Sequence, residues 1–263
     1  MMRTSNPTLN QAVFAKERSF GVGDSMTIQG TVNKCFILLG LIVLSASWVW
    51  GKVMQPTSVL GGEMMAKEMG AQAAASVTPF IFGGAIGGFI LALVTIFNKP
   101  ASKITAPLYA LCEGLVLGGV SAIFEQNYPG IVIQAVGLTF ATMFCMLSLY
   151  KSRIIKVNEK FIFGVATATG AICLVYLVNF IMSFFGRSIP FIYSSGLMGI
   201  GFSLLVVGIA AMNLILDFYV IEEGSKAGAP KYMEWYGAFA LMVTLIWLYL
   251  EILRLLAKMR SRR

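Results

Sequence analysis

The sequence predicts an all-α polytopic membrane protein, folded as a bundle of seven transmembrane helices. Of its 263 residues, 57% are hydrophobic and only 12% are charged, whereas a soluble domain averages about 25% charged residues. The apolar residues gather in seven runs, each near the roughly 20 residues that a helix needs to cross a bilayer. The net charge of +8 does not indicate nucleic-acid binding, because the basic residues lie between the runs and at both ends, as topology signals and lipid headgroup contacts do.

The predicted domain organisation is a leader, a membrane domain and a tail. The polar leader, residues 1–33, lacks the apolar core of a signal peptide and is expected in the cytoplasm. The membrane domain spans residues 34–257, and residues 258–263 form a basic tail. The seven apolar runs cover residues 34–50, 77–97, 104–124, 130–150, 161–185, 191–216 and 235–256.

Small residues at helix-packing spacing occur in the second and third runs. Gly83 with Gly87, Gly84 with Gly88, and Gly114 with Gly118 form GxxxG pairs. Lipid provides no hydrophobic drive between helices, so close backbone approach through small residues stabilises such bundles. Plain helix packing is the favoured interpretation of these glycines; a sliding gate is the alternative.

The basic residues of the loops predict the orientation of the chain. Twelve Lys and Arg residues lie in the amino-terminal segment and in the loops after the second, fourth and sixth runs; the loops of the opposite side carry Lys52, Lys67 and Arg187. The amino terminus is therefore expected in the cytoplasm. The cations from Arg254 onward conflict with this rule if all seven helices span. Either the tail is exported or the last helix does not cross fully, and the apolar length favours full spanning.

The residue types of the chain argue against an enzyme. There is no histidine, which excludes Ser-His, Cys-His and HExxH sites. An intramembrane aspartyl protease uses aspartates on two adjacent helices, and Asp217 is the only aspartate in or beside the seven runs. The four cysteines are scattered singly, so neither a disulfide framework nor a zinc site is expected. We expect no enzymatic activity and no cofactor.

Three acids stand in or beside the apolar runs. Glu113 lies inside the third run and Glu251 inside the seventh, while Asp217 follows the sixth run at the expected membrane boundary. A charge at bilayer depth costs about 2.5 to 3.5 kcal/mol on insertion scales, so such residues usually mark ion paths, proton relays or internal pairs. The alternatives are a helix-end carboxylate for Asp217, a protonated and hydrogen-bonded side chain for Glu113, and a local ion pair with Arg254 for Glu251.

The last loop adds three more acids near the expected depth of Asp217. Glu222 and Glu223 are interpreted as solvated loop charges or as a weak attractor of cations, and Glu234 as an acid at a helix start, which the helix dipole favours. A direct pair between Asp217 and Glu251 would need a bent or late-starting last helix, because Glu251 lies about 24 Å along it. Glu222, Glu223 and Glu234 are therefore easier partners for Asp217.

Five stretches resemble a known family. They are residues 6–14, which begin NPTLN, 26–34 (MTIQGTVNK), 106–119 (APLYALCEGLVLGG), 213–224 (NLILDFYVIEEG) and 228–257 (GAPKYMEWYGAFALMVTLIWLYLEILRLLA). In their order they resemble a bacterial branch of the Bax inhibitor family, also called the transmembrane Bax-inhibitor-motif family. The resemblance implies a seven-helix bundle with a central last helix and, by analogy with characterised relatives, a pH-sensitive calcium leak.

The resemblance also implies roles for individual residues. In relatives, an aspartate closing the sixth helix and one in the seventh share a proton and gate the pore. The first falls on Asp217, which is then a possible calcium ligand. The second falls on Glu251 when the LYLE motif is aligned, or near Thr244 when the terminal Leu-Leu-Arg is aligned; the sequence supports both.

Two functions from different classes follow from the sequence. The first is a calcium or other cation leak of the bacterial inner membrane, gated by protonation of buried carboxylates. The second is a non-conducting membrane protein that modulates a membrane protease or stress survival through other membrane proteins. The expected partners are thus the lipid bilayer, calcium or protons, and in the second case other membrane proteins.

Overall fold

The fold consists almost entirely of long helices. The computed structural model describes residues 25–53, 63–187, 189, 192 and 194–262. The helices are α2 (Ile28–Val53), α3 (Glu63–Phe97), α4 (Ser102–Asn127), α5 (Ile131–Lys151), α6 (Glu159–Phe184), α8 (Leu197–Lys226) and α9 (Met233–Ser261), with a 3-10 turn η2 (Lys99–Ala101) before α4. All seven contain a stretch long and apolar enough to cross a membrane, which confirms the predicted all-α seven-helix bundle. Within the described residues the only extended pairing is an isolated bridge between Ser25 and Pro230.

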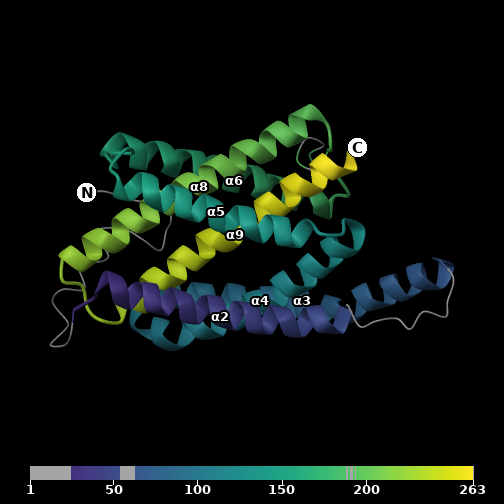
Figure 1. Cartoon of the computed structure of the whole chain (residues 1–263), viewed down its shortest axis with the longest axis horizontal. Coiled ribbons are helices and arrows are strands. Elements are labelled where there is room, and N and C mark those ends of the chain that lie inside the picture. Colours follow the sequence, from purple (N-terminus) through teal and green to yellow (C-terminus); the bar gives the residue numbers. More distant parts are fainter. Residues whose placement is uncertain (1–24, 54–62, 188, 190–191, 193, 263) are drawn as a thin grey trace.

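Helix α9 lies at the centre of the bundle. In Figure 1 it crosses diagonally between a layer formed by α2, α3 and α4 and a layer formed by α5, α6 and α8, and it packs against α2, α4, α5 and α8. It is also the most enclosed span, with 61% of its apolar window buried against 17% for α3, α5 and α6. Its side chains Tyr236, Phe239 and Leu248 are fully buried. The expected central last helix is therefore present.

The helices extend further than the apolar runs predict. Helix α2 begins at Ile28 rather than at residue 34, α8 continues ten residues past 216 to Lys226, and α9 runs on to Ser261. Hydropathy marks only the part of a helix inside the hydrocarbon, whereas polar residues can continue the helix when their side chains are satisfied locally. Lys226, for example, forms ion pairs with Glu222 and Glu223 one turn back.

These longer helices change the predicted boundaries of the membrane domain. Residues 28–33, expected in the leader, form the first turns of α2, and residues 258–261, expected in the tail, form the last turn of α9. Asp217, expected at the end of the sixth helix, lies nine residues inside α8. The rest of the leader, residues 1–24, lies outside the described residues.

The GxxxG glycines mark two close helix contacts. A Cβ on Gly84 would lie 2.6 Å from the carbonyl oxygen of Cys112, so α3 and α4 approach backbone to backbone. On α4, Gly114 lies against Ile42 and Ser45 of α2, and a Cβ on Gly118 would lie 2.5 Å from the carbonyl oxygen of Ala46. Helix α4 is thus clamped between α2 and α3 through small residues, as the packing interpretation predicts. Gly83 differs, because a Cβ there would meet nothing within 4 Å.

Gly118→Ala should destabilise the bundle, because its Cβ would overlap backbone atoms of Ala46, which cannot rotate away. We expect the loss typical of overpacking, about 1 to 3 kcal/mol, measured as a lower unfolding temperature in detergent. The matched control is Gly83→Ala, which adds the same methyl group to a helix where there is room and should leave the unfolding temperature unchanged or higher. Equal unfolding temperatures for the two variants would contradict the close α2–α4 contact.

Candidate functional site

The carboxylate of Glu234, in the first turn of α9, is fully buried at the start of the bundle. It accepts hydrogen bonds from the Thr27 backbone N–H at 3.0 Å, from the Thr27 hydroxyl at 2.9 Å and from Lys34 at 2.7 Å. The Lys231 ammonium lies 3.0 Å from Oε1 of Glu234. The Glu234 carboxylate also fills the space beside Gly30, where a Cβ would collide with it. Glu234 thus joins the start of α2 to the start of α9, a tertiary contact that helix-start spacing alone does not reveal.

Residues 25–27 reinforce this junction. The Met26 backbone N–H donates to the carbonyl oxygen of Ala229 at 2.6 Å, and the Ser225 hydroxyl donates to the carbonyl oxygen of Met26 at 3.3 Å. The Met26 side chain is 1% exposed. The chain before α2 is therefore held against the turn that joins α8 to α9, and Glu234, just after that turn, is surrounded by Lys34, Lys231 and the Thr27 N–H.

Asp217 lies deep inside the bundle, on α8. It is 1% exposed, and the residues on the same face of α8, Leu214, Val220 and Ile221, belong to the main apolar core. Its carboxylate lies close enough to the Cys35 thiol of α2 for the two groups to interact. A carboxylate at this position is therefore enclosed by the surrounding helices and shielded from solvent.

Helix contacts give the residues of α9 that lie level with Asp217. A Cβ on Gly237 would lie 3.3 Å from Ile221 of α8 and 3.4 Å from Thr31 of α2. Helices α8 and α9 run in opposite directions. Asp217 lies one turn before Ile221 on α8, so it is level with the residue one turn after Gly237 on α9, which is about Leu241. Glu251 follows ten residues later, about 15 Å along the axis. The structure therefore does not bring Asp217 and Glu251 to one level, and Thr244 is the α9 candidate that lies nearer to Asp217.

Glu251 has a polar environment of its own. It is 2% exposed, and its Oε1 accepts from the Tyr176 hydroxyl at 2.9 Å and from Arg254 at 2.8 Å. Arg254 also donates to the Tyr176 hydroxyl at 2.9 Å and lies over that ring. The Oε2 of Glu251 is buried and has no hydrogen-bond partner among the described residues. The local ion pair with Arg254 is therefore present, with a tyrosine of α6 completing it.

A buried lysine lies beside this group. Lys258 is 6% exposed, and its ammonium donates to the Ser203 hydroxyl at 2.7 Å and to the carbonyl oxygen of Gly199 at 3.1 Å, both on α8. Sequence reasoning missed it by placing Lys258 in the basic tail. The available signal was its spacing, because Lys258 follows Arg254 by four residues and Glu251 by seven, which puts all three on one helix face.

Glu113 occupies a third location, between α3 and α4. Its carboxylate is half-buried and lies against Gly88, where a Cβ would be 3.1 Å from Oε1. The Tyr109 hydroxyl, one turn earlier on α4, is within reach of a side-chain hydrogen bond to it. The next residue, Gly114, contacts Ile42 of α2. Ile42 lies seven residues past Cys35, the α2 residue near Asp217, so Glu113 is about 10 Å along the bundle from the level of Asp217.

The two acids at the end of α8 are partly exposed and paired. Glu222 accepts from the Tyr150 hydroxyl at 2.5 Å and lies 2.5 Å from Lys226, and Glu223 lies 3.1 Å from the same lysine. The predicted acids thus occupy separate positions along the bundle, each with its own neighbours. No three His, Cys, Asp or Glu residues within the described ranges lie close enough to hold a metal ion.

Glu234→Ala should destabilise the protein strongly, because it leaves the ammonium of Lys34 and the Thr27 N–H without their shared acceptor. Removing one partner of a buried ion pair costs about 3 to 5 kcal/mol, so the unfolding temperature in detergent should fall markedly. Glu223→Ala, which removes a half-exposed carboxylate paired with Lys226, should cost no more than about 1 kcal/mol. Similar losses for the two variants would argue against Glu234 as the link between α2 and α9.

Comparison with known proteins identifies the chain at the level of its family. No curated protein and no solved structure matches it. The model of the family described as Bax inhibitor 1 like matches residues 6–261, which include all seven membrane-spanning helices and every acid described above. The chain therefore belongs to the Bax inhibitor 1 like family.

Proposed function

We propose that this protein is a pH-sensitive calcium leak in which Asp217 binds the proton that closes the path. The observation that carries the proposal is the position of Asp217, 1% exposed and nine residues inside a membrane-spanning helix. Acids enclosed in membrane-spanning helices are energetically costly, and those that occur usually mark ion paths, proton relays or internal pairs. Family membership supports a membrane protein of this kind, and the leak activity itself is our proposal.

The direction of gating follows from the cost of burying charge. A neutral, protonated Asp217 is compatible with the closed packing of α8 against α9 and α2. An ionised Asp217 at this buried position loses its hydration, and water or a cation that reaches it lowers this cost. Loss of the proton therefore favours separation of α8 from α9, which opens the path, and acidification closes it.

Calcium is the proposed cargo of the protein. It is a hard cation that selects oxygen ligands, and Asp217 supplies a carboxylate inside the span. The described residues contain no group of three metal-ligating acids, cysteines or histidines, so a tight resident site is not part of the proposal. A single carboxylate holds a divalent cation weakly enough to release it, as conduction requires.

The other acids have subordinate roles in this proposal. Glu251, with Arg254 and Tyr176, forms a second polar group about 15 Å from the level of Asp217, and Glu113 lies in a third place beside α3. Glu222 and Glu223 lie at the end of α8, where they attract cations once Lys226 is displaced. Glu234 keeps the start of α9 in place. The membrane is proposed to be a bacterial inner membrane with the amino terminus in the cytoplasm.

Asp217→Asn should abolish the pH dependence of calcium flux in proteoliposomes, because asparagine mimics the neutral closed form. Flux through the wild type should rise with pH by up to about tenfold per unit below the midpoint of a single titrating site. The variant should stay low throughout. Flux is measured with a trapped calcium-sensitive dye at matched protein content.

The control for this experiment is Glu159→Gln, which neutralises an exposed acid in the first turn of α6 and should keep the wild-type pH profile. An Asp217→Asn profile identical to that of the wild type would refute the role of Asp217. Equal calcium leakage from empty and protein-loaded vesicles at every pH would refute the leak itself and would favour a non-conducting protein that acts through other membrane proteins.

A further inference from the structure

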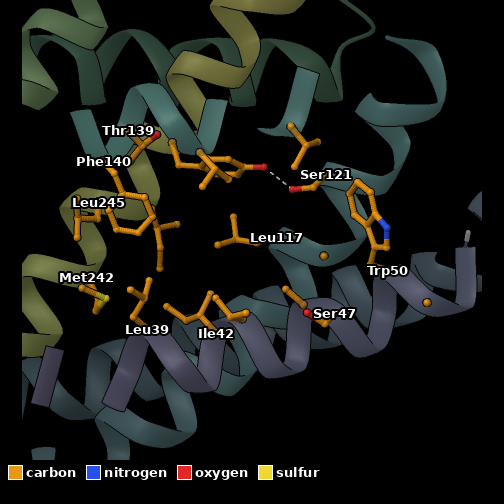
Figure 2. A pocket seen from close by; sticks show the side chains of 18 residues that line it. Leu39, Ile42, Ser47, Trp50, Leu117, Ser121, Thr139, Phe140, Met242 and Leu245 are labelled. Atoms are coloured by element: carbon orange, nitrogen blue, oxygen red, sulfur yellow. Dashed lines mark hydrogen bonds between the residues drawn. The ribbon is translucent and has the colours of Figure 1, made fainter. Parts of the chain in front are cut away.

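A pocket of about 440 Å³ lies between four helices, away from the acids discussed above. Helices α4 and α9 contribute Leu117 and Leu245 to its lining among others, and α2 and α5 contribute Leu39 and Phe140 among others (Figure 2). Along α2 it extends from Leu39 to Gly51, about 18 Å at 1.5 Å per residue. The volume lies within the range of about 300 to 1,000 Å³ that is usual for small-molecule sites.

The lining of the pocket is apolar. None of the residues that line it carries a charge, and three of its hydroxyls are engaged within the protein. Ser121 and Tyr249 share a hydrogen bond of 2.6 Å, drawn in Figure 2, and the Thr139 hydroxyl donates to the carbonyl oxygen of Ala135 at 2.7 Å. A ligand that fits this lining is a hydrocarbon with few polar atoms of its own.

The pocket faces the lipid and ends near one membrane surface. Val43 lines it and is itself 56% exposed, in the middle of a span, so hydrocarbon is the medium at the opening. Towards Gly51 the pocket reaches the last turn of α2 and the first turn of α5. This end lies on the side of the membrane where α9 ends.

Charged groups lie at that end, at the depth of a phospholipid headgroup. Lys52 directly follows Gly51 and holds its ammonium over the rings of Trp48 and Phe80, and Arg260 donates to the carbonyl oxygen of Pro129, two residues before α5. The carboxylate of Glu125 nearby accepts from the backbone N–H groups of Gly130 and Val132 and thereby caps α5. An apolar channel that ends beside cations matches an acyl chain attached to a phosphate-containing headgroup.

We propose that this pocket holds one acyl chain of a phospholipid drawn from the leaflet on the side where α9 ends. The chain lies along α2, with its terminal part over Leu117 and Leu245 and its headgroup end near Gly51. The acyl chain fills the space between α2 and α5 that the side chains of α4 and α9 do not occupy. This lipid site is independent of the proposed ion leak, because Asp217 does not line the pocket.

Trp50, which lines the pocket near its headgroup end, provides the test. A variant with Trp50 as its sole tryptophan (Trp48→Phe, Trp235→Phe, Trp247→Phe) is reconstituted in phosphatidylcholine vesicles with brominated or unbrominated acyl chains. Trp50 should lose most of its fluorescence in the brominated lipid. Val136→Phe, which fills the pocket from α5, should restore most of it. The matched control is Val178→Phe on the lipid-facing side of α6, 48% exposed, which should restore none.

A second measurement covers the case in which Val136→Phe disturbs folding. Ser47→Phe fills the same pocket from the α2 wall, and native mass spectrometry counts phospholipid retained by each variant in mild detergent. The wild type and Val178→Phe should retain a phospholipid that Ser47→Phe loses, with helical circular dichroism unchanged. Unquenched Trp50, as expected if a second copy covers the opening, would overturn the proposal. The proposal would also be overturned if Val136→Phe left the quenching unchanged and Ser47→Phe left the retained phospholipid unchanged.

Discussion

Buried charges hold the central helix α9 at both ends, and the arrangement of the other helices depends on this. At its start, Glu234 collects donors from Thr27, Lys34 and Lys231. At its end, Lys258 donates to Gly199 and Ser203 of α8. Between helices in lipid the hydrophobic effect provides no attraction, so paired charges and close glycine contacts determine which helix lies where. Because the charges differ in sign, the polarity of α9 within the bundle is fixed as well.

The acids serve two different physical purposes. Glu234 is bound by Lys34, Lys231 and Thr27, so its buried charge is compensated, and removing either side of this group would leave a charge uncompensated. Asp217 lies on an apolar face of α8 with Leu214, Val220 and Ile221, where a charge is expensive. Glu251 is intermediate, since Oε1 is bound by Tyr176 and Arg254 and Oε2 is not hydrogen-bonded within the described chain. Burial alone therefore does not distinguish these acids, whereas their neighbours do.

The sequence predicts the helices better than it predicts the contacts between them. Hydropathy counts correctly give seven spans and the spacing of Gly114 and Gly118 correctly indicates a packing face, because both are local properties of one helix. The level of Asp217 relative to Glu251 depends on where α8 ends, and hydropathy cannot show that polar residues up to Lys226 remain helical. Two partners of Glu234, Thr27 and Lys34, lie about 200 residues away along the chain, a separation at which no spacing rule applies.

The length of α8 and α9 has a consequence for the membrane around the protein. Helices of 30 and 29 residues measure about 44 Å each, whereas the hydrocarbon layer is about 30 Å thick. Two antiparallel helices joined by a short turn can match that layer only by tilting together or by keeping their ends among the headgroups. In a thicker membrane the two helices then tilt less from the bilayer normal, and in a thinner membrane they tilt more. Bilayer thickness thereby sets how much of this hairpin projects from the surface, which makes its angle a mechanical response to lipid composition.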